Sequence, residues 1–165
     1  MAQVVEIRIA ELFAGKSGET ILTNGIGSCI VIILHDPLAR VGGMSHAILP
    51  RQVAQIQGEE VVRGPDALGR YESRYADQSI DMLVKKIEEL GGVKERLIAK
   101  LVGGADMFFL LEGVDGGVGV ANVLAARERL REYHIPIKSE VVGGSVGRNA
   151  RVDLSTGIVE IVTKV

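Results

Sequence analysis

The chain has 165 residues, of which 47% are hydrophobic, with a formal net charge of −2 and one cysteine. This length and hydrophobic content predict a single domain, residues 1–165, whose core needs no disulfide or metal for stability. The scattered basic residues and the lack of tryptophan argue against nucleic-acid binding, which needs a concentrated cationic face and stacking aromatic rings. One cysteine forms no internal disulfide, which is typical of a reducing compartment.

The N-terminal stretch, residues 4–12, alternates β-branched and polar residues and is predicted to be a strand. The first fifteen residues have neither the basic region nor the long apolar run of a secretory signal. No apolar run in the chain approaches the roughly 20 residues that span a bilayer. We therefore expect a soluble cytoplasmic protein without membrane insertion.

The segment TNGIGSCIVIILHDPLARVGGMSHAILP, residues 23–50, carries the cysteine and a histidine on two apolar runs that predict a β-hairpin. Asp-Pro favours a turn. A four-residue loop over 36–39 places Cys29 directly opposite His46, with Cβ atoms about 4.5–5.5 Å apart. A bulge at Gly42–Gly43 would shift this register, and a slip of one residue would turn His46 to the other face.

A cysteine beside a histidine is typical of nucleophilic catalysis, because the imidazole accepts the thiol proton. Gly25 and Gly27 allow a sharp turn that leaves backbone N–H groups free to bind an oxyanion. Thr23, across that turn, is a candidate for orienting the imidazole. On this hypothesis Cys29 is alkylated at a pH well below the roughly 8.5 of a free thiol. The alternatives are an inert buried cysteine beside a structural histidine, and a redox sensor that lacks a resolving cysteine.

The remainder of the chain predicts one irregular segment, two helices and further strands. Residues 50–75 lack a sustained period and are predicted to be a loop, either functional beside His46 or without a role. Helices are predicted over 79–90 and roughly 119–134, the second with Val120, Val123, Leu124, Leu130 and Tyr133 facing inward. Strands are predicted at 29–34, 97–102, 135–142, 150–154 and 157–165. Many strands with two helices indicate an α+β layered domain.

Metal and phosphate sites are not indicated. The candidate zinc ligands Cys29, His35, His46 and His134 lack the paired spacings of structural zinc sites. The stretches GGADMFF (103–109) and GGSVGRN (143–149) lack the lysine of a phosphate-binding loop. We expect glycine turns at strand ends there, and neither metal nor cofactor.

Six segments, in order, carry a family resemblance over nearly the whole chain. They are TNGIGSCIVIILHDP, VGGMSHAILP, RYADQSIDMLVKKIEELG, AKLVGGADMF, VANVLAARERLREYHIPI and VGGSVGRNARVDLSTGIVEI. Together they resemble the chemoreceptor glutamine deamidases of bacterial and archaeal chemotaxis, the CheD family. The family pattern usually has asparagine before the histidine, where this chain has Ser45.

The resemblance implies Cys29 as nucleophile, His46 as base and Thr23 as the orienting hydroxyl. It implies an α+β layered β-sandwich with helices packed on one side, similar to the cysteine hydrolase domain of deamidating bacterial toxins. The implied reaction converts glutamine side chains of methyl-accepting chemotaxis receptors to glutamate through a thioester, with receptor methyl esters opened by the same chemistry. The implied partner is a CheC-type phosphatase that binds and restrains the enzyme. The alternative is a binding module that docks receptor or phosphatase with weak or no turnover.

Overall fold

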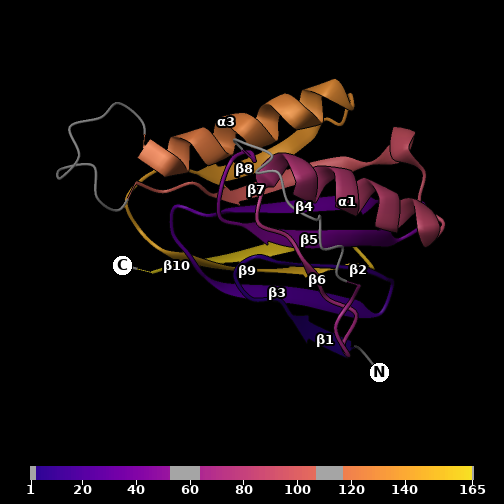
Figure 1. Cartoon of the computed structure of the whole chain (residues 1–165). Helices are drawn as coiled ribbons and strands as arrows, with labels where there is room; N and C mark the ends of the chain where they lie inside the picture. The colour runs from indigo at the N-terminus through magenta and orange to yellow at the C-terminus, as the bar shows by residue number, and fades with distance from the viewer. Residues whose placement is uncertain (1–2, 53–63, 107–116, 165) are drawn as a thin grey trace.

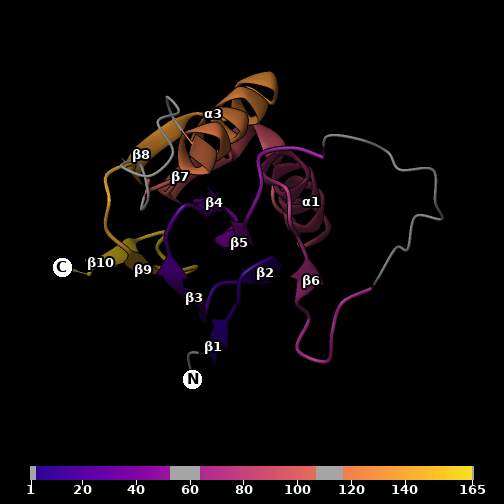
Figure 2. The same ribbon diagram turned by 60° about the vertical axis from the view of Figure 1, so that its left-hand side comes forward.

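The computed structural model describes residues 3–52, 64–106 and 117–164, which form two β-sheets and a layer of two α-helices. The six-stranded sheet has the order β6 (Tyr71–Glu72), β2 (Glu11–Lys16), β5 (Val41–Ala47), β4 (Ile30–Asp36), β7 (Ile98–Gly103) and β8 (Ile137–Val142). The four-stranded sheet has the order β1 (Gln3–Glu6), β3 (Glu19–Ile26), β9 (Arg148–Asp153) and β10 (Val159–Thr163). Helices α1 (Ala76–Glu89) and α3 (Gly117–Glu132) cover the face of the six-stranded sheet that is turned away from the other sheet (Figures 1 and 2). A short 3-10 helix, Lys94–Arg96, precedes β7.

Strand β4 lies at the centre of these layers, and all its residues are buried. Ile30, Ile32 and Leu34 pack in the core under the helices, while Val31 and Ile33 pack in the core between the sheets. Successive strand residues point to opposite faces, so a strand covered on both sides needs an unbroken apolar run. This explains the five aliphatic residues after Cys29. The packing of two sheets with helices on one side, in the described residues, confirms the α+β class.

The helix predicted at 79–90 is α1, which begins three residues earlier than expected. Its apolar positions Ile80, Leu83, Val84 and Ile87 are buried against the six-stranded sheet. Gly91 has a φ of 99°, and its N–H donates to Glu88 O at 3.0 Å. A glycine in this left-handed conformation ends the helix, as the sequence indicated.

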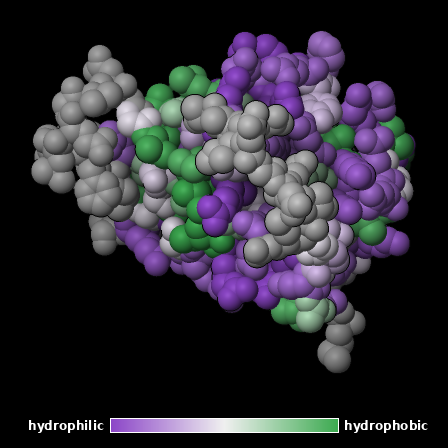
Figure 3. Space-filling model, in the orientation of Figure 1, coloured by the Kyte–Doolittle hydropathy of each residue, from purple (hydrophilic) through white to green (hydrophobic). Residues whose placement is uncertain are grey.

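The second predicted helix is α3, but its buried face differs from the expectation. Val120 and Leu124 were expected to face inward and are 41% and 55% exposed. The side chains that face the sheet are instead mostly small, namely Gly119, Asn122, Val123, Ala125, Ala126 and Leu130. Small residues let α3 approach the sheet closely: a Cβ at Gly119 would lie 2.5 Å from the carbonyl oxygen of Ala105. Val120 and Leu124 therefore add apolar area to the protein surface. On the face shown in Figure 3, hydrophobic residues gather in patches among polar ones.

The N-terminal prediction of one strand over 4–12 is wrong, because the chain changes sheets within it. Strand β1 ends at Glu6 and β2 begins at Glu11, and Ala10 between them has a left-handed φ of 64°. The intervening residues 7–10 form a crossover held at both ends by hydrogen bonds, Ile7 N to Leu22 O (2.9 Å) and Ala10 N to His46 O (2.8 Å). Strand β3, which the sequence did not predict, lies beside β1.

The remaining predicted strands are present, with ends shifted by at most two residues. The predicted loop 50–75 contains the short strand β6 near its end, and residues 53–63 of it lie outside the described residues. One correction bears directly on the site, because the β4–β5 hairpin has a different register. Its loop is 37–40 rather than 36–39, and His46 lies opposite Val31 rather than Cys29.

Asp36 accounts for the observed register, because it stays in the strand pair opposite Val41. Its carboxylate accepts hydrogen bonds from Leu38 N, Ala39 N, Val93 N and the Arg96 guanidinium. Burial would raise the pKa of Asp36, but these hydrogen bonds outweigh burial and hold the pKa at about 2. The register therefore differs by two residues, which preserves the face.

Cys29 continues the β4–β7 ladder, since Gly104 N donates to its carbonyl oxygen at 2.7 Å. Strand alternation then places Cys29 on the face of Val31 and His46, toward the four-stranded sheet. Cys29 and His46 are thus diagonal neighbours on adjacent strands, for which Cα atoms are typically about 7–8 Å apart. The predicted shared face is retained, and the predicted direct opposition is wrong.

Candidate active site

His46 on β5 and Thr23 on β3 are fully buried side chains from the two facing sheets. Thr23 Oγ1 lies 2.7 Å from His46 Nδ1 and 2.8 Å from the carbonyl oxygen of Ile7 in the 7–10 crossover. A hydroxyl has one proton, and a carbonyl oxygen only accepts. Thr23 therefore donates to Ile7 and accepts from an Nδ1–H, which assigns the Nδ1-protonated tautomer to His46.

This tautomer leaves a lone pair on His46 Nε2, the other ring nitrogen. Nε2 is buried and has no hydrogen-bond partner within the described part of the chain. Burial lowers the pKa of His46 to about 4, so the ring is neutral at neutral pH. A neutral, oriented imidazole with a free Nε2 has the properties of a general base.

Cys29 lies half-buried directly before β4 and makes no hydrogen bond to His46 in this structure. Burial raises the pKa of its thiol, and a hydrogen bond from its own backbone N–H opposes this less strongly. The expected acidic thiol is therefore wrong for the resting protein. A nearby positive charge would lower the thiol pKa, but the ring of His46 is neutral.

We expect the pH dependence of Cys29 alkylation by iodoacetamide to reflect this raised pKa. Desolvation disfavours the thiolate, so the rate in the folded protein should rise at a higher pH than in the same chain unfolded in urea, whose thiol has the ordinary pKa of about 8.5. His46→Ala should shift the curve little, because the neutral ring contributes no charge. A folded-state curve displaced below the unfolded one would instead indicate a resting thiolate–imidazolium pair.

The turn that carries Cys29 is held by the end of β7 and by α3. All three carbonyl oxygens of residues 27–29 accept hydrogen bonds there. The bonds are Ala105 N to Gly27 O (3.0 Å), Asn122 Nδ2 to Ser28 O (2.8 Å) and Gly104 N to Cys29 O (2.7 Å). A Cβ at Gly103 would lie 2.3 Å from Cys29 O, so the paired glycines allow this close approach. This agrees with the glycine turn predicted at the strand end.

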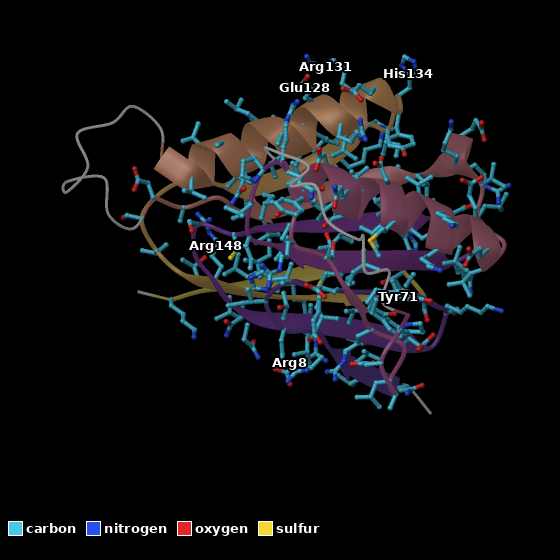
Figure 4. The ribbon with its side chains drawn as sticks, viewed as in Figure 1. Arg8, Tyr71, Glu128, Arg131, His134 and Arg148 are labelled. Carbon is cyan, nitrogen blue, oxygen red and sulfur yellow. The ribbon has the colours of Figure 1, made fainter. Side chains whose placement is uncertain are left out.

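Arg148 on β9 is a nearly buried side chain that the sequence did not single out. Its guanidinium donates to Gly103 O at 3.3 Å and to Gly143 O at 2.8 Å, and its Nε has no partner among the described residues. Figure 4 shows Arg148 between α3 and the four-stranded sheet. Arg148 thus fixes the end of β7 beside Cys29, and an arginine directly after a glycine turn was its one signal in the sequence.

A surface hollow of about 500 Å³ lies beside Thr23 and the 7–10 crossover. It is lined by Glu6, Ile7, Arg8, Ile9, Glu11 and Asn24, so it adjoins the Thr23 side of the site and does not include Cys29. Arg8 pairs with Glu11 across it at 3.1 Å and lies at the edge of the molecule away from the helices (Figure 4).

The other two histidines lie apart from Cys29 and His46. His35, six residues along from Cys29, hydrogen-bonds through Nε2 to Leu154 O at 2.9 Å, and His134 follows the end of α3 (Figure 4). Within residues 3–52, 64–106 and 117–164, no three His, Cys, Asp or Glu side chains gather as a metal site would require. The described helices are all too short or too polar to cross a membrane.

The sequence of this chain is similar to sequences of known proteins. Residues 64–163 match the family model described as CheD chemotactic sensory transduction. A probable chemoreceptor glutamine deamidase CheD 2 of Geobacter metallireducens is 35% identical over 162 residues, covering 98% of this chain and 94% of the relative. A probable chemoreceptor glutamine deamidase CheD of Clostridium botulinum strain Hall is 39% identical over 160 residues, covering 96% and 92%. The chain belongs to the CheD family, as the sequence resemblance indicated.

Proposed function

We propose that this protein hydrolyses glutamine side-chain amides of methyl-accepting chemotaxis receptors, giving glutamate and ammonia. The observation that carries the proposal is the buried Thr23–His46 pair, which leaves His46 Nε2 free on the sheet face that also carries Cys29. The names of the relatives supply the substrate class. We assign the protein to the cysteine hydrolases, of the kind found in deamidating toxins, with one domain working in the cytoplasm.

The first step forms a thioester at Cys29. The sulfur attacks the amide carbon while His46 Nε2 takes the thiol proton, and the amide oxygen becomes an oxyanion. Burial disfavours both the thiolate and the imidazolium. The proton is therefore transferred during attack rather than beforehand. The Nε2 proton then passes to the leaving nitrogen, the C–N bond breaks and ammonia departs.

The second step returns the enzyme to its resting state. His46 Nε2 accepts a proton from water as the oxygen attacks the thioester carbon, and the C–S bond breaks. The proton returns to the sulfur and glutamate is released, so the sum is amide plus water giving acid plus ammonia. The same acyl chemistry opens a glutamate methyl ester on the receptor. A CheC-type phosphatase is the partner that we propose to restrain this activity, on the family resemblance.

We expect the purified protein to release one ammonia for each receptor glutamine converted. The test incubates it with a cytoplasmic fragment of a chemotaxis receptor, with ammonia measured enzymatically and glutamate located by mass spectrometry. The matched control is the same fragment with its modified glutamines replaced by glutamate, which should give no ammonia. Equal ammonia from both fragments would contradict the proposal.

A binding module is the alternative, and the missing Cys29–His46 hydrogen bond with the raised thiol pKa is the observation that favours it. This alternative makes a different prediction in the same assay. It predicts tight binding to the receptor fragment or to a CheC-type phosphatase, with no ammonia released from several receptors.

A further inference from the structure

We propose that Asn122 is a positioning residue that turns the N–H of Cys29 toward the reacting carbonyl, where it forms the oxyanion hole with the N–H of Ser28. The inference rests on the hydrolysis proposed above and assigns the donors that this reaction requires.

Asn122 is fully buried on α3, and its amide is oriented by two carbonyl groups. Nδ2 donates to Ser28 O at 2.8 Å and to Ile48 O at 2.9 Å. The reverse orientation would place the amide oxygen against two other oxygens, so the pair of bonds fixes the assignment. Oδ1 is left buried without a partner among the described residues. An apolar residue would avoid that unsatisfied oxygen, so burial alone does not explain an asparagine here.

The two carbonyls lie on the two chain segments that carry Cys29 and His46. Ser28 precedes the nucleophile, and Ile48 follows His46 by two residues. The β4–β5 register, extended by one pair beyond Ile30 and Ala47, places Ile48 opposite Cys29. One side chain therefore clamps the open end of the hairpin at the level of the nucleophile.

The clamp also sets the direction of backbone N–H groups. In a planar trans peptide, the C=O of one residue and the N–H of the next point in opposite directions. Ser28 C=O points to Asn122, so the N–H of Cys29 points away from α3. Gly27 C=O points to Ala105 N, just after β7, so the N–H of Ser28 points away from Ala105. Neither N–H donates to another residue within the described structure. Two free donors thus lie beside the nucleophile.

The position of these donors suits an oxyanion. The oxyanion forms on the carbon bonded to Cys29 Sγ, which is within reach of the N–H of the same residue. Without Asn122 the Ser28–Cys29 peptide can rotate, and the N–H of Cys29 is no longer preorganised.

The test compares Asn122→Ala with Asn149→Ala. Asn149 holds the same turn from the other side, through a hydrogen bond from Gly25 N to its Oδ1 at 3.0 Å, but it touches none of the carbonyls of residues 27–29. Asn122→Ala should lower kcat for receptor glutamine by about 10²-fold, the effect of losing one oxyanion donor. KM should stay within about threefold of wild type, because the interaction is made in the transition state. Asn149→Ala should keep kcat within about threefold of wild type.

The rate of Cys29 alkylation distinguishes a role of Asn122 in the oxyanion hole from a general loss of structure. Iodoacetamide reacts with Cys29 by displacement at carbon and forms no oxyanion, so its rate should be the same in wild type and Asn122→Ala. Alkylation and hydrolysis falling together would show that Asn122 merely holds Cys29 in place, and would overturn the inference. An equal kcat loss in Asn149→Ala would overturn it as well. If Asn122→Ala does not fold, Asn122→Ser takes its place.

A peptide that carries an aldehyde in place of the glutamine side-chain amide tests the oxyanion hole without receptor hydrolysis. It adds to Cys29 as a hemithioacetal, whose oxygen occupies the oxyanion position without turnover. Asn122→Ala should bind it at least about tenfold more weakly than wild type. Absence of the wild-type adduct, or equal affinity in both proteins, would overturn the inference. Absence of ammonia release by wild type, with this aldehyde difference present, would overturn only the proposed receptor hydrolysis.

Discussion

Cys29→Ala is expected to abolish hydrolysis of receptor glutamine, and His46→Ala to lower kcat by about 10²–10⁴-fold. The first change removes the sulfur that forms the thioester, so covalent catalysis has no first step. The second leaves the thiol without a base and the departing nitrogen without an acid. Because the two groups act as one unit, the double variant should be little worse than Cys29→Ala alone. Ammonia release from the receptor fragment measures all three.

Ser45→Ala is the matched control for these variants, because Ser45 precedes His46 on β5. Its side chain lies on the opposite face of the strand, is fully buried, and has an Oγ without a partner in the described structure. Removing that hydroxyl should leave kcat within about threefold of wild type, since no hydrogen bond is lost. Equal conversion by wild type and Cys29→Ala would contradict the hydrolase proposal directly.

The sequence predicted that Cys29 and His46 share a face, but it could not predict their distance. The Asp-Pro turn located the hairpin, and the alternation of strand residues supplied the face. The register depended on Asp36, whose partners include Val93 and Arg96, more than fifty residues away. No local pattern shows such a contact. The error of two residues preserved the face, and an error of one would have reversed it.

Thr23 illustrates a different limit of sequence reasoning. Its nearness to the glycine turn made it a candidate, and the family resemblance gave it a role. The direction of its hydrogen bonds depends on the carbonyl of Ile7, a main-chain group that any residue type would supply. The predicted single strand over 4–12 also hid the 7–10 crossover that presents this carbonyl. The tautomer of His46 was therefore accessible only from the structure.

The position of Asn122 within α3 is a signal that the sequence itself contains. Residues 119, 123, 126 and 130 define the face of α3 that meets the sheet, and position 122 lies on the same face. A polar residue on the buried face of a helix needs a partner. The larger side chains Val120 and Leu124 suggest a different inward face, but close approach of α3 to the sheet requires small residues there.

The second large effect is expected from Thr23→Val, which keeps the shape of the side chain and removes the hydroxyl. Ile7 O and His46 Nδ1 then lose their buried partner, which should lower the free energy of unfolding by about 2–4 kcal/mol. The ring is also free to adopt the Nε2–H tautomer, which cannot accept the thiol proton. We expect kcat to fall by about 10²-fold, less than in Cys29→Ala, because the base is disoriented rather than removed.

Thr23→Ser is the matched rescue variant, since serine keeps one donor and its lone pairs. It should restore kcat to within about tenfold of wild type. Long-range proton–nitrogen NMR correlations report the tautomer directly, and wild type should show His46 protonated at Nδ1. A wild-type ring protonated at Nε2 would contradict the general-base assignment, because the nitrogen without a partner would then carry the proton. Full activity in Thr23→Val, with Nδ1–H retained, would show that the protein environment fixes the ring without this hydroxyl.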